Sequence, residues 1–363
     1  MIYINGRFLT QRMTGSQRFA YEILTQLLYN KLNNYCVLVP PGEIQAGYNI
    51  DGWPIKTVGK LKSTIWEQVD LPIFLYRNGG HLLINLVNTA PCLYKNQIAT
   101  IMDMTTFVNP KWFTRSFSTY YKLILPVIGK NSLKILTVSE HSKKDILRFI
   151  NIAPAKVEVI YCAVSKNFMA AAKAFSQQED ILKKIGIKKN AYILGVSSLD
   201  PRKNFDTLIR AYLQMNTDLP LIIVGSSGKA FASSALEHLA AEQVNIKFTG
   251  YVSDEELISL YKFASCFVYP SLYEGFGLPP LEAMACGCPT IVSNSSSIPE
   301  VCGDASIYVE PTDVDNLNTA ISDLLSNQSK RENLIELGYA REKKFSWVAS
   351  CKRLEVIIHE LVQ

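Results

Sequence analysis

Short apolar runs typical of buried β-strands alternate with helical patterns along most of the 363 residues. Parallel strands need a long crossover connection, usually a helix, so this alternation is typical of parallel sheets. We therefore expect an α/β fold with mainly parallel sheets. Strand patterns cover residues 2–4, 36–39, 82–84, 98–101, 135–138, 157–160, 192–196, 221–224, 246–248, 266–269 and 289–292, and helical spacing marks residues 17–28, 205–215 and 348–361.

The strand patterns form two series, separated by a polar stretch rich in Ala, Lys and Gln at residues 170–190. A chain of this length is too long for one ordinary hydrophobic core. We therefore expect two Rossmann-like β/α/β domains, residues 1–166 and 167–345, facing each other across a cleft. Open α/β sheets bind ligands at the carboxyl ends of their strands, so facing domains would share one ligand.

Charge is divided unevenly between the two series. Residues 1–166 contain 19 Lys and Arg and 9 Asp and Glu, a net charge of +10, whereas residues 167–363 contain 18 and 23, a net charge of −5. A basic half beside an acidic half predicts that the first domain meets an anionic partner. With 48% hydrophobic and 19% charged residues, the composition excludes an intrinsically disordered chain.

The cysteines and histidines predict no metal centre. None of the eight cysteines has CxxC spacing and most lie in apolar runs, which is typical of buried free thiols in a reducing compartment. The N-terminal sequence lacks the apolar segment of a signal peptide, and no uncharged run reaches the roughly 20 residues of a spanning helix. We therefore expect a soluble or peripheral protein. A zinc site is not expected, because the four histidines are scattered: His81, His141, His238 and His359.

The segment "SLYEGFGLPPLEAMACGCPT", residues 271–290, follows a predicted strand. Gly275 and Gly277 permit a tight backbone path, and two prolines suit the first turn of a helix over residues 281–286 that Gly287 ends. Backbone N–H groups around residues 276–278 would then point outward at a positive helix end. Such a helix end predicts a site for a phosphate or diphosphate group.

Two glutamates flank that turn. Glu274, just before the turn, can accept hydrogen bonds from sugar hydroxyls, and Glu282, expected in the first helical turn, can bind a ribose diol. Either glutamate alone also fits an ordinary helix start, where acidic residues interact favourably with the helix dipole. The pair around a glycine turn favours the ligand-binding interpretation.

A second loop, residues 195–204, lies between a predicted strand and a predicted helix and places Arg202 beside Lys203. Two cations there would neutralise a diphosphate leaving group as charge develops on it. The alternative is a solvated basic pair, but cations are electrostatically unfavourable at the start of a helix. The loop therefore favours a role in binding or catalysis.

Two single residues leave alternatives open. Gly15, ahead of the first helix, would let a substrate approach the backbone, although a plain turn explains it nearly as well. Asp103 ends a strand at the expected cleft, and it would either contact a sugar hydroxyl or cap its own loop.

Residues 105–134 combine cations with aromatic side chains and contain no acidic residue. Basic and aromatic residues beside amphipathic helices suit an anionic membrane interface. An ordinary helical pair with one face in the core is the alternative. No nucleic-acid motif accompanies the segment, so nucleic acid is not an expected partner. The cations are Lys111, Arg115, Lys122, Lys130 and Lys134, and the aromatic residues are Trp112, Phe113, Phe117, Tyr120 and Tyr121.

Residues 5–347 resemble the retaining glycosyltransferases of family four, which have the GT-B fold. The most specific match is the pair Glu274 and Glu282, separated by seven residues and followed by "AMACGCP". Residues 195–204, 221–225 and 248–252 also match, while residues 14–15 and 137–142 match more loosely.

Two positions depart from the family pattern. Many relatives carry a histidine where this chain has Met102, next to Asp103, and that histidine is usually assigned to the donor sugar or the transition state. Relatives also often have Asn-Gly where this chain has Cys162 and Ala163. Loss of the histidine would alter the sugar preference, slow the chemistry or leave its role to another group, and the loop at Cys162 and Ala163 would be tuned differently.

The resemblance implies roles residue by residue. Arg202 and Lys203 would bind the donor diphosphate, Glu274 would lie beside the donor sugar, and Glu282 would hold the ribose. With Asp103, the first three are the candidate catalytic residues. The C-terminal helix, residues 346–363, would pack back on the first domain. The remaining donor-binding positions are Gly15, Ser197, Tyr251, Val252, Gly275, Phe276, Gly277 and Leu278.

The resemblance further implies transfer of a hexose, with retention at the anomeric carbon, from a nucleotide diphosphate sugar to a hydroxyl, without metal or cofactor. A glycan or polyprenyl-diphosphate-linked saccharide at the inner face of the cytoplasmic membrane would be the acceptor, because it suits the basic and aromatic first domain. This favours a cytoplasmic, peripheral enzyme of bacterial polysaccharide or O-antigen assembly. The alternatives are a sugar nucleotide epimerase, a phosphorylase, and a non-catalytic protein that binds a sugar nucleotide or glycan.

Overall fold

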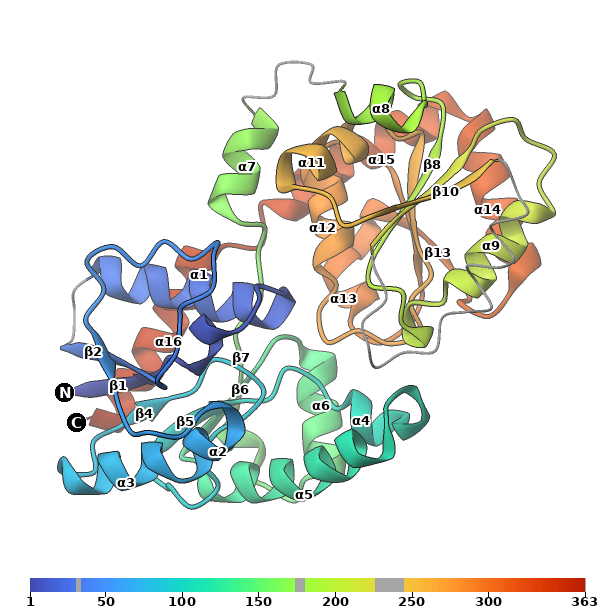
Figure 1. Ribbon diagram of the computed structural model, residues 1–363. Helices are drawn as coiled ribbons and strands as arrows, with labels where there is room; N and C mark the ends of the chain where they lie inside the picture. Colours follow the sequence, from blue (N-terminus) through green and yellow to red (C-terminus); the bar gives the residue numbers. More distant parts are fainter. Residues whose placement is uncertain (31–33, 174–179, 226–244, 363) are drawn as a thin grey trace. The chain divides into compact units, whose positions relative to one another are not determined.

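The computed structural model describes residues 1–30, 34–173, 180–225 and 245–362. The chain divides into two compact units, of which the first contains Met1–Val108, Arg115–Cys162 and Ser346–Gln363. The second contains Asn109–Thr114 and Ala163–Phe345. Each unit has a parallel sheet with helices on both faces, as Figure 1 shows, so the predicted α/β fold is confirmed.

Seven parallel strands form the sheet of the first unit, in the order β3-β2-β1-β4-β5-β6-β7. Strand order reverses direction at β1 and β4, which makes the carboxyl ends of this pair a topological switch point. The residues of β1, β4 and β5 are all buried, as expected for a sheet covered on both faces. The strands are β1 (Ile2–Asn5), β2 (Tyr35–Val39), β3 (Ile55–Thr57), β4 (Leu83–Ile84), β5 (Gln97–Thr100), β6 (Lys134–Thr137) and β7 (Val157–Val159).

Helices α1 and α16 pack together on one face of the first sheet, and α2, α3 and α5 lie on the other (Figure 1). The rings of Phe19 and Trp347 meet edge to face at 5.9 Å, which joins the C-terminal helix to α1. The helices of this unit are α1 (Gly15–Asn30), α2 (Ser63–Gln68), α3 (Asp70–Arg77), α4 (Thr105–Val108), α5 (Arg115–Asn131), α6 (Glu140–Phe149) and α16 (Trp347–Val362), with 3-10 turns η1 (Arg7–Thr10) and η3 (Pro154–Lys156).

Six parallel strands form the sheet of the second unit, in the order β10-β9-β8-β11-β12-β13. Here strand order reverses at β8 and β11, and all residues of both strands are buried. The carboxyl ends of β8 and β11 are therefore the second switch point. The strands are β8 (Ile193–Val196), β9 (Leu221–Val224), β10 (Ile246–Gly250), β11 (Cys266–Tyr269), β12 (Thr290–Ser293) and β13 (Ser306–Val309).

Helices α9 and α14 cover one face of the second sheet and share a hydrophobic core with it, while α11, α12 and α15 lie on the opposite face. The helices of this unit are α7 (Lys166–Lys173), α8 (Asp180–Ile185), α9 (Phe205–Leu213), α11 (Asp254–Lys262), α12 (Leu278–Ala285), α13 (Ile298–Cys302), α14 (Val314–Ser326) and α15 (Gln328–Glu342), with 3-10 turns η2 (Pro110–Trp112), η4 (Pro201–Lys203) and η5 (Gly303–Ala305).

Candidate functional site

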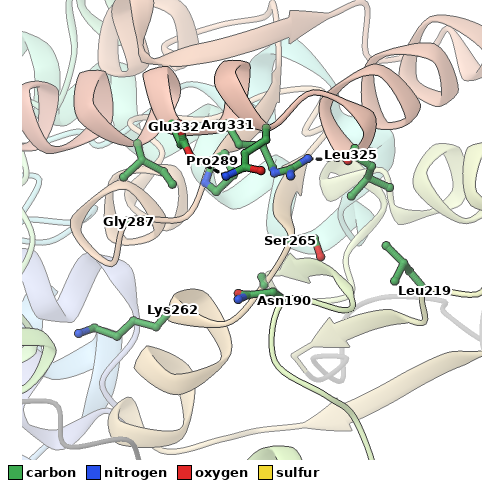
Figure 2. Close-up of a pocket in the computed structure, with 12 residues that line it drawn as sticks. Asn190, Leu219, Lys262, Ser265, Gly287, Pro289, Leu325, Arg331 and Glu332 are labelled. Atoms are coloured by element: carbon green, nitrogen blue, oxygen red, sulfur yellow. Dashed lines mark hydrogen bonds between the residues drawn. The ribbon is translucent and has the colours of Figure 1, made fainter.

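A cavity of about 380 Å³ opens at the amino ends of the second sheet's strands (Figure 2). Its lining includes Asn190, Ser265 and Pro289, which come shortly before β8, β11 and β12. Open α/β sheets bind their ligands at the opposite edge, outside the carboxyl ends of the strands. This cavity is therefore not the predicted site, and none of the predicted site residues lines it.

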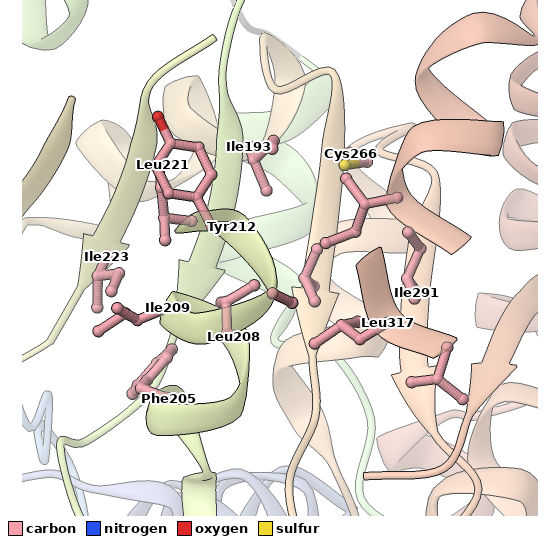
Figure 3. Close-up of a cluster of buried hydrophobic side chains, with 14 of the residues drawn as sticks. Ile193, Phe205, Leu208, Ile209, Tyr212, Leu221, Ile223, Cys266, Ile291 and Leu317 are labelled. Carbon is pink, nitrogen blue, oxygen red and sulfur yellow. The ribbon is translucent and has the colours of Figure 1, made fainter. Parts of the chain in front are cut away.

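At the carboxyl edge, the loop after β8 presents Arg202 and Lys203. Asp200 holds this loop, since its Oδ1 accepts hydrogen bonds from the backbone N of Arg202 at 3.2 Å and lies 3.3 Å from Arg202 Nε. Asn204 turns the chain into α9 in the left-handed region, with a φ of 59°. Helix α9 then packs its apolar face against the sheet, beginning with Phe205 (Figure 3).

Three predicted residues meet where the loops after β8 and β11 come together. Lys203 Nζ donates to Glu274 Oε1 at 2.6 Å, and Arg202 Nη1 donates to Glu274 Oε2 at 3.3 Å. The hydroxyls of Tyr269 and Ser271 donate to the same Oε1 at 2.7 and 2.6 Å. Glu274 is only 6% exposed and Lys203 only 7%. The switch point of the second sheet therefore holds a buried, fully hydrogen-bonded ion pair.

The electrostatics of this cluster keep Glu274 ionised. Burial by itself raises the pKa of Glu274, but the charges of Lys203 and Arg202 and the hydrogen bonds from Lys203 and Ser271 outweigh it and lower the pKa to about 2. For Lys203, burial and the charge of Arg202 lower the pKa, and the charge of Glu274 opposes them. The 2.6 Å contact favours the charged form of both partners. Burial and Glu274 raise the pKa of Tyr269, so this hydroxyl stays a donor.

The glycine turn after Glu274 leads into α12 earlier than expected. Gly277 adopts a φ of 109°, and an added Cβ there would lie 2.6 Å from Ile298 Cδ1, so only glycine fits. Helix α12 begins at Leu278, three residues before the predicted start, with the two prolines in its first turn. Glu282 consequently lies in the second turn of α12, not in the first, because the left-handed glycine acts as the N-cap.

The turn itself is buried and braced by serine hydroxyls, while the direction of the backbone N–H groups around residues 276–278 stays a prediction. Ser296 Oγ accepts from the backbone N of Glu274 at 2.8 Å. Ser297 Oγ donates to the carbonyls of Glu274 and Phe276 at 2.9 and 2.7 Å. Gly275, Phe276 and Gly277 are buried, while Leu278 at the helix start is partly exposed.

The other predicted donor-binding residues of the second unit follow the neighbouring strands. Ser197 follows β8, and Tyr251 and Val252 follow β10, with Tyr251 exposed and Val252 buried. Gly225 follows β9 with a φ of 142°, and an added Cβ would lie 1.7 Å from the Ser197 carbonyl oxygen. Because these strands are parallel, all of these residues gather at one edge of the sheet.

Two residues of the first unit had alternative roles left open, and the structure shows the surroundings of each. Gly15 is the exposed first residue of α1, and apart from its chain neighbours and its own helix backbone nothing lies within 4 Å of a Cβ added there. Asp103 Oδ1 accepts from the backbone N and the hydroxyl of Thr105 at 2.9 and 2.5 Å. Loop capping is therefore the role that the structure shows for Asp103. Beside it, Met102 is buried and its backbone N donates to Asn88 Oδ1 at 2.6 Å.

A second buried ion pair, which the sequence analysis did not predict, lies at the switch point of the first sheet. Arg7 Nε donates to Glu67 Oε1 at 3.0 Å, and Asn5 Nδ2 donates to the same oxygen at 2.8 Å and to Asn85 Oδ1 at 2.9 Å. A polar residue at the end of a buried strand, such as Asn5 after the apolar residues of β1 and Asn85 after β4, could have indicated this cluster. The same signal marks Ser271, Ser296 and Ser297, which were also missed.

Metal-ligand side chains do not cluster in the described part of the chain, where no three His, Cys, Asp or Glu residues could hold an ion together. Of the histidines considered above, His238 lies outside the described residues. The cysteines are all free, as predicted, and six of the eight are buried.

The chain is similar in sequence to a family of glycosyl transferases and to bacterial mannosyltransferases. The family described as "Glycosyl transferases group 1" matches residues 177–341. O-antigen chain mannosyltransferase B of Escherichia coli is 35% identical over 289 residues, which cover 78% of this chain and 73% of that protein. The serotype-specific mannosyltransferase WbdA of Escherichia coli is 31% identical over 220 residues, 59% of this chain but 27% of that longer protein, so the chain spans about a quarter of its length.

Among solved structures, sucrose-phosphate synthase from Thermosynechococcus elongatus has a TM-score of 0.78 with 18% sequence identity. The match covers 99% of this chain and 98% of that one. At this identity the likeness concerns the fold alone, and it confirms the predicted GT-B fold.

Proposed function

The chain belongs to the group 1 glycosyl transferases, and we propose that it transfers mannose from a nucleotide diphosphate mannose to a saccharide hydroxyl in polysaccharide assembly. Mannose is proposed because the relatives reported above are named as mannosyltransferases, one of them for the O-antigen chain. One observation supports the chemistry: Arg202 and Lys203 converge on Glu274 at the switch point of the second sheet.

In the proposed mechanism, Arg202 contacts the donor diphosphate. Its side chain is 22% exposed, whereas that of Lys203 is 8% exposed and lies against Glu274. Glu274 and Asp200 hold the guanidinium in place before the reaction. A cation that is already oriented stabilises the charge that grows on the leaving diphosphate without reorganising.

We propose retention by attack on the front face of the sugar. The bond between the anomeric carbon and the diphosphate oxygen breaks, and the acceptor oxygen bonds to the same face of that carbon. The departing phosphate oxygen takes the acceptor proton, which balances the step without a protein base. No metal or cofactor is assigned a role, since Arg202, Lys203 and the start of α12 supply positive charge.

For the acceptor, we propose a polyprenyl-diphosphate-linked saccharide at the cytoplasmic face of the membrane. The net charge of +10 in residues 1–166 supports an anionic acceptor or surface on this side of the protein. The O-antigen role in the relative's name supports a lipid-linked glycan.

The test compares Arg202→Ala, Lys203→Ala and Glu274→Ala in a transfer assay with nucleotide diphosphate mannose and a synthetic saccharide acceptor. Each should lower kcat/KM by about 10²-fold or more, Arg202→Ala through the loss of a transition-state contact and the other two through the loss of the pair that positions this arginine. Arg210→Ala is the matched control, because this arginine of α9 is 64% exposed and should leave the rate unchanged. Thermal unfolding identifies any loss of fold, above all for the buried Lys203.

Near wild-type rates in all three variants would overturn the assignment. The anomeric configuration of the product, read by nuclear magnetic resonance, tests retention separately. Conversion of the donor without any acceptor would instead indicate an epimerase. Binding of the donor without turnover would indicate a non-catalytic protein.

A further inference from the structure

A row of exposed apolar side chains runs along α2 and α3 of the first unit. Ile65, Val69, Ile73 and Tyr76 are between 41% and 63% exposed, although all are large and apolar. Backbone hydrogen bonds from Val69 to Ile65 and from Ile73 to Val69 continue the helical path across the junction of the two helices. Their spacing of four, four and three residues puts them on one side. An aligned apolar row of this kind marks an interaction surface.

Helix α5 extends this row. Leu123 and Val127, one helical turn apart, are 69% and 40% exposed. Leu93, 75% exposed, lies in the loop between β4 and β5. Tyr76 Oη of α3 donates to the Leu93 carbonyl at 2.8 Å, and Asn131 Nδ2 of α5 donates to the carbonyl of the preceding Cys92 at 2.8 Å. The loop therefore connects the apolar rows of α3 and α5, which lie on the same face of the sheet (Figure 1).

The segment that carries these apolar side chains is rich in cations. Residues 60–134 contain nine Lys and Arg but three Asp and Glu. The acids do not offset the cations at the surface, since Glu67 is buried and Asp70 accepts from the backbone N of Lys60 and Leu61. Asp103 is engaged by Thr105. The exposed cations of this segment that belong to the first unit are Lys60, Lys62, Arg77, Lys95, Arg115, Lys122 and Lys130.

Of the aromatic residues that first indicated a membrane interface, Phe117 of α5 is 42% exposed. Tyr120 and Tyr121 are partly buried and pack against the hydrophobic core under α5. Most of the exposed apolar surface comes instead from side chains of α2, α3, α5 and the loop that contains Leu93, and most of these are aliphatic. No described helix is long and apolar enough to cross a bilayer, so a contact by these helices would lie along the membrane surface.

We propose that the α2–α3–α5 face, formed by Ile65, Val69, Ile73, Tyr76, Leu93, Leu123, Val127 and the seven exposed cations above, docks on an anionic lipid bilayer. Apolar side chains flanked by lysine and arginine match the acyl boundary and the negative headgroups of such a surface. A second copy of the chain is disfavoured as the occupant, because pairing of this face with itself would bring like charges together. The proposal rests on the proposed function only for its biological purpose, to bring a lipid-linked acceptor within reach.

The experiment is sedimentation of the full-length protein with vesicles, either of phosphatidylcholine alone or of equal parts phosphatidylcholine and phosphatidylglycerol. The wild type should bind the anionic vesicles at least ~10-fold more strongly, and added salt should weaken binding. The apolar variant Ile73→Gln/Leu93→Gln/Leu123→Gln and the charge variant Lys95→Gln/Lys122→Gln/Lys130→Gln should each lose ~10-fold or more of that binding.

Matched controls lie outside the face. Leu213→Gln in the second unit removes an exposed leucine, and Lys352→Gln on α16 removes an exposed lysine. Both should bind like the wild type. Transfer to a water-soluble acceptor should be unchanged in all variants, so loss of docking is distinguished from failure of the proposed function.

Absence of wild-type binding to anionic vesicles, or equal losses in the control variants, overturns the proposal. Self-association that the apolar variant abolishes would assign the face to a second copy and would overturn it as well.

Discussion

At the scale of single residues, Glu274 gives the fold a characteristic acid response. Its carboxyl pKa is about 2 in the folded protein against an ordinary value of 4.5, so the folded state binds this proton more weakly than the unfolded state. Its contribution to the free energy of unfolding is therefore complete above about pH 4.5 and is lost as the pH falls towards 2. Chemical denaturation at a series of pH values should show this loss in the wild type and not in Glu274→Gln.

At neutral pH the same Glu274→Gln variant should be less stable by about 3 kcal/mol, because Lys203 stays buried without its carboxylate. Glu360→Gln, at an exposed position of α16, is the matched control and should follow the wild-type curve throughout. Parallel pH profiles for wild type and Glu274→Gln would show that this carboxylate does not carry the acid response.

At the scale of elements, Gly15 at the start of α1 and Gly225 after β9 can be compared by alanine substitution. We expect Gly15 to matter for donor binding and Gly225 for steric reasons. Alanine at Gly15 meets nothing beyond its chain neighbours and its own helix backbone and favours a helix start, so Gly15→Ala should keep or slightly raise the melting temperature. If the donor approaches this backbone, kcat/KM should fall by about 10-fold. Unchanged kinetics would favour the plain-turn alternative for Gly15.

Gly225→Ala is the contrasting substitution at the end of β9. Its Cβ would lie 1.7 Å from the Ser197 carbonyl oxygen, at a φ that L-residues rarely adopt. We expect a marked loss of melting temperature together with activity. A variant as stable as the wild type would mean that the loop after β8 moves aside easily.

Element positions were predicted well where the apolar pattern was strong and poorly where tertiary contacts decide. Strands such as β9, with four buried aliphatic residues, carry an unmistakable pattern. The short strand β3 escaped prediction because it is largely exposed, and β13 because Ser306 and Tyr308 interrupt its apolar run. The start of α12 was expected at residue 281, after the prolines, whereas a left-handed Gly277 caps the helix and the prolines lie inside its first turn.

At the scale of the whole molecule, the contacts within the candidate site could not be predicted from the sequence either, because they depend on tertiary structure. The sequence singled out Arg202, Lys203 and Glu274, but not that they contact one another, because that depends on β8 and β11 being neighbours in the sheet. The strand order also creates an equivalent place in the first unit, where Arg7 pairs with Glu67. Each unit thus places a buried cation–carboxylate pair at its own switch point, a correspondence that appears only once the topology is known.

The whole enzyme is expected to work without a divalent metal, because protein cations are available where the donor diphosphate would bind. Arg202 and Lys203 carry two positive charges, which Asp200 and Glu274 orient and partly offset, and α12 adds the positive end of a helix dipole. After dialysis against EDTA, initial transfer rates should stay within about twofold of the untreated protein, and added Mg²⁺ or Mn²⁺ should not raise them further. A glycosyltransferase with known manganese dependence, dialysed in parallel, verifies that the chelation was effective. Transfer that disappears in EDTA and returns with Mn²⁺ would show that a metal, rather than Arg202 and Lys203 alone, balances the leaving diphosphate.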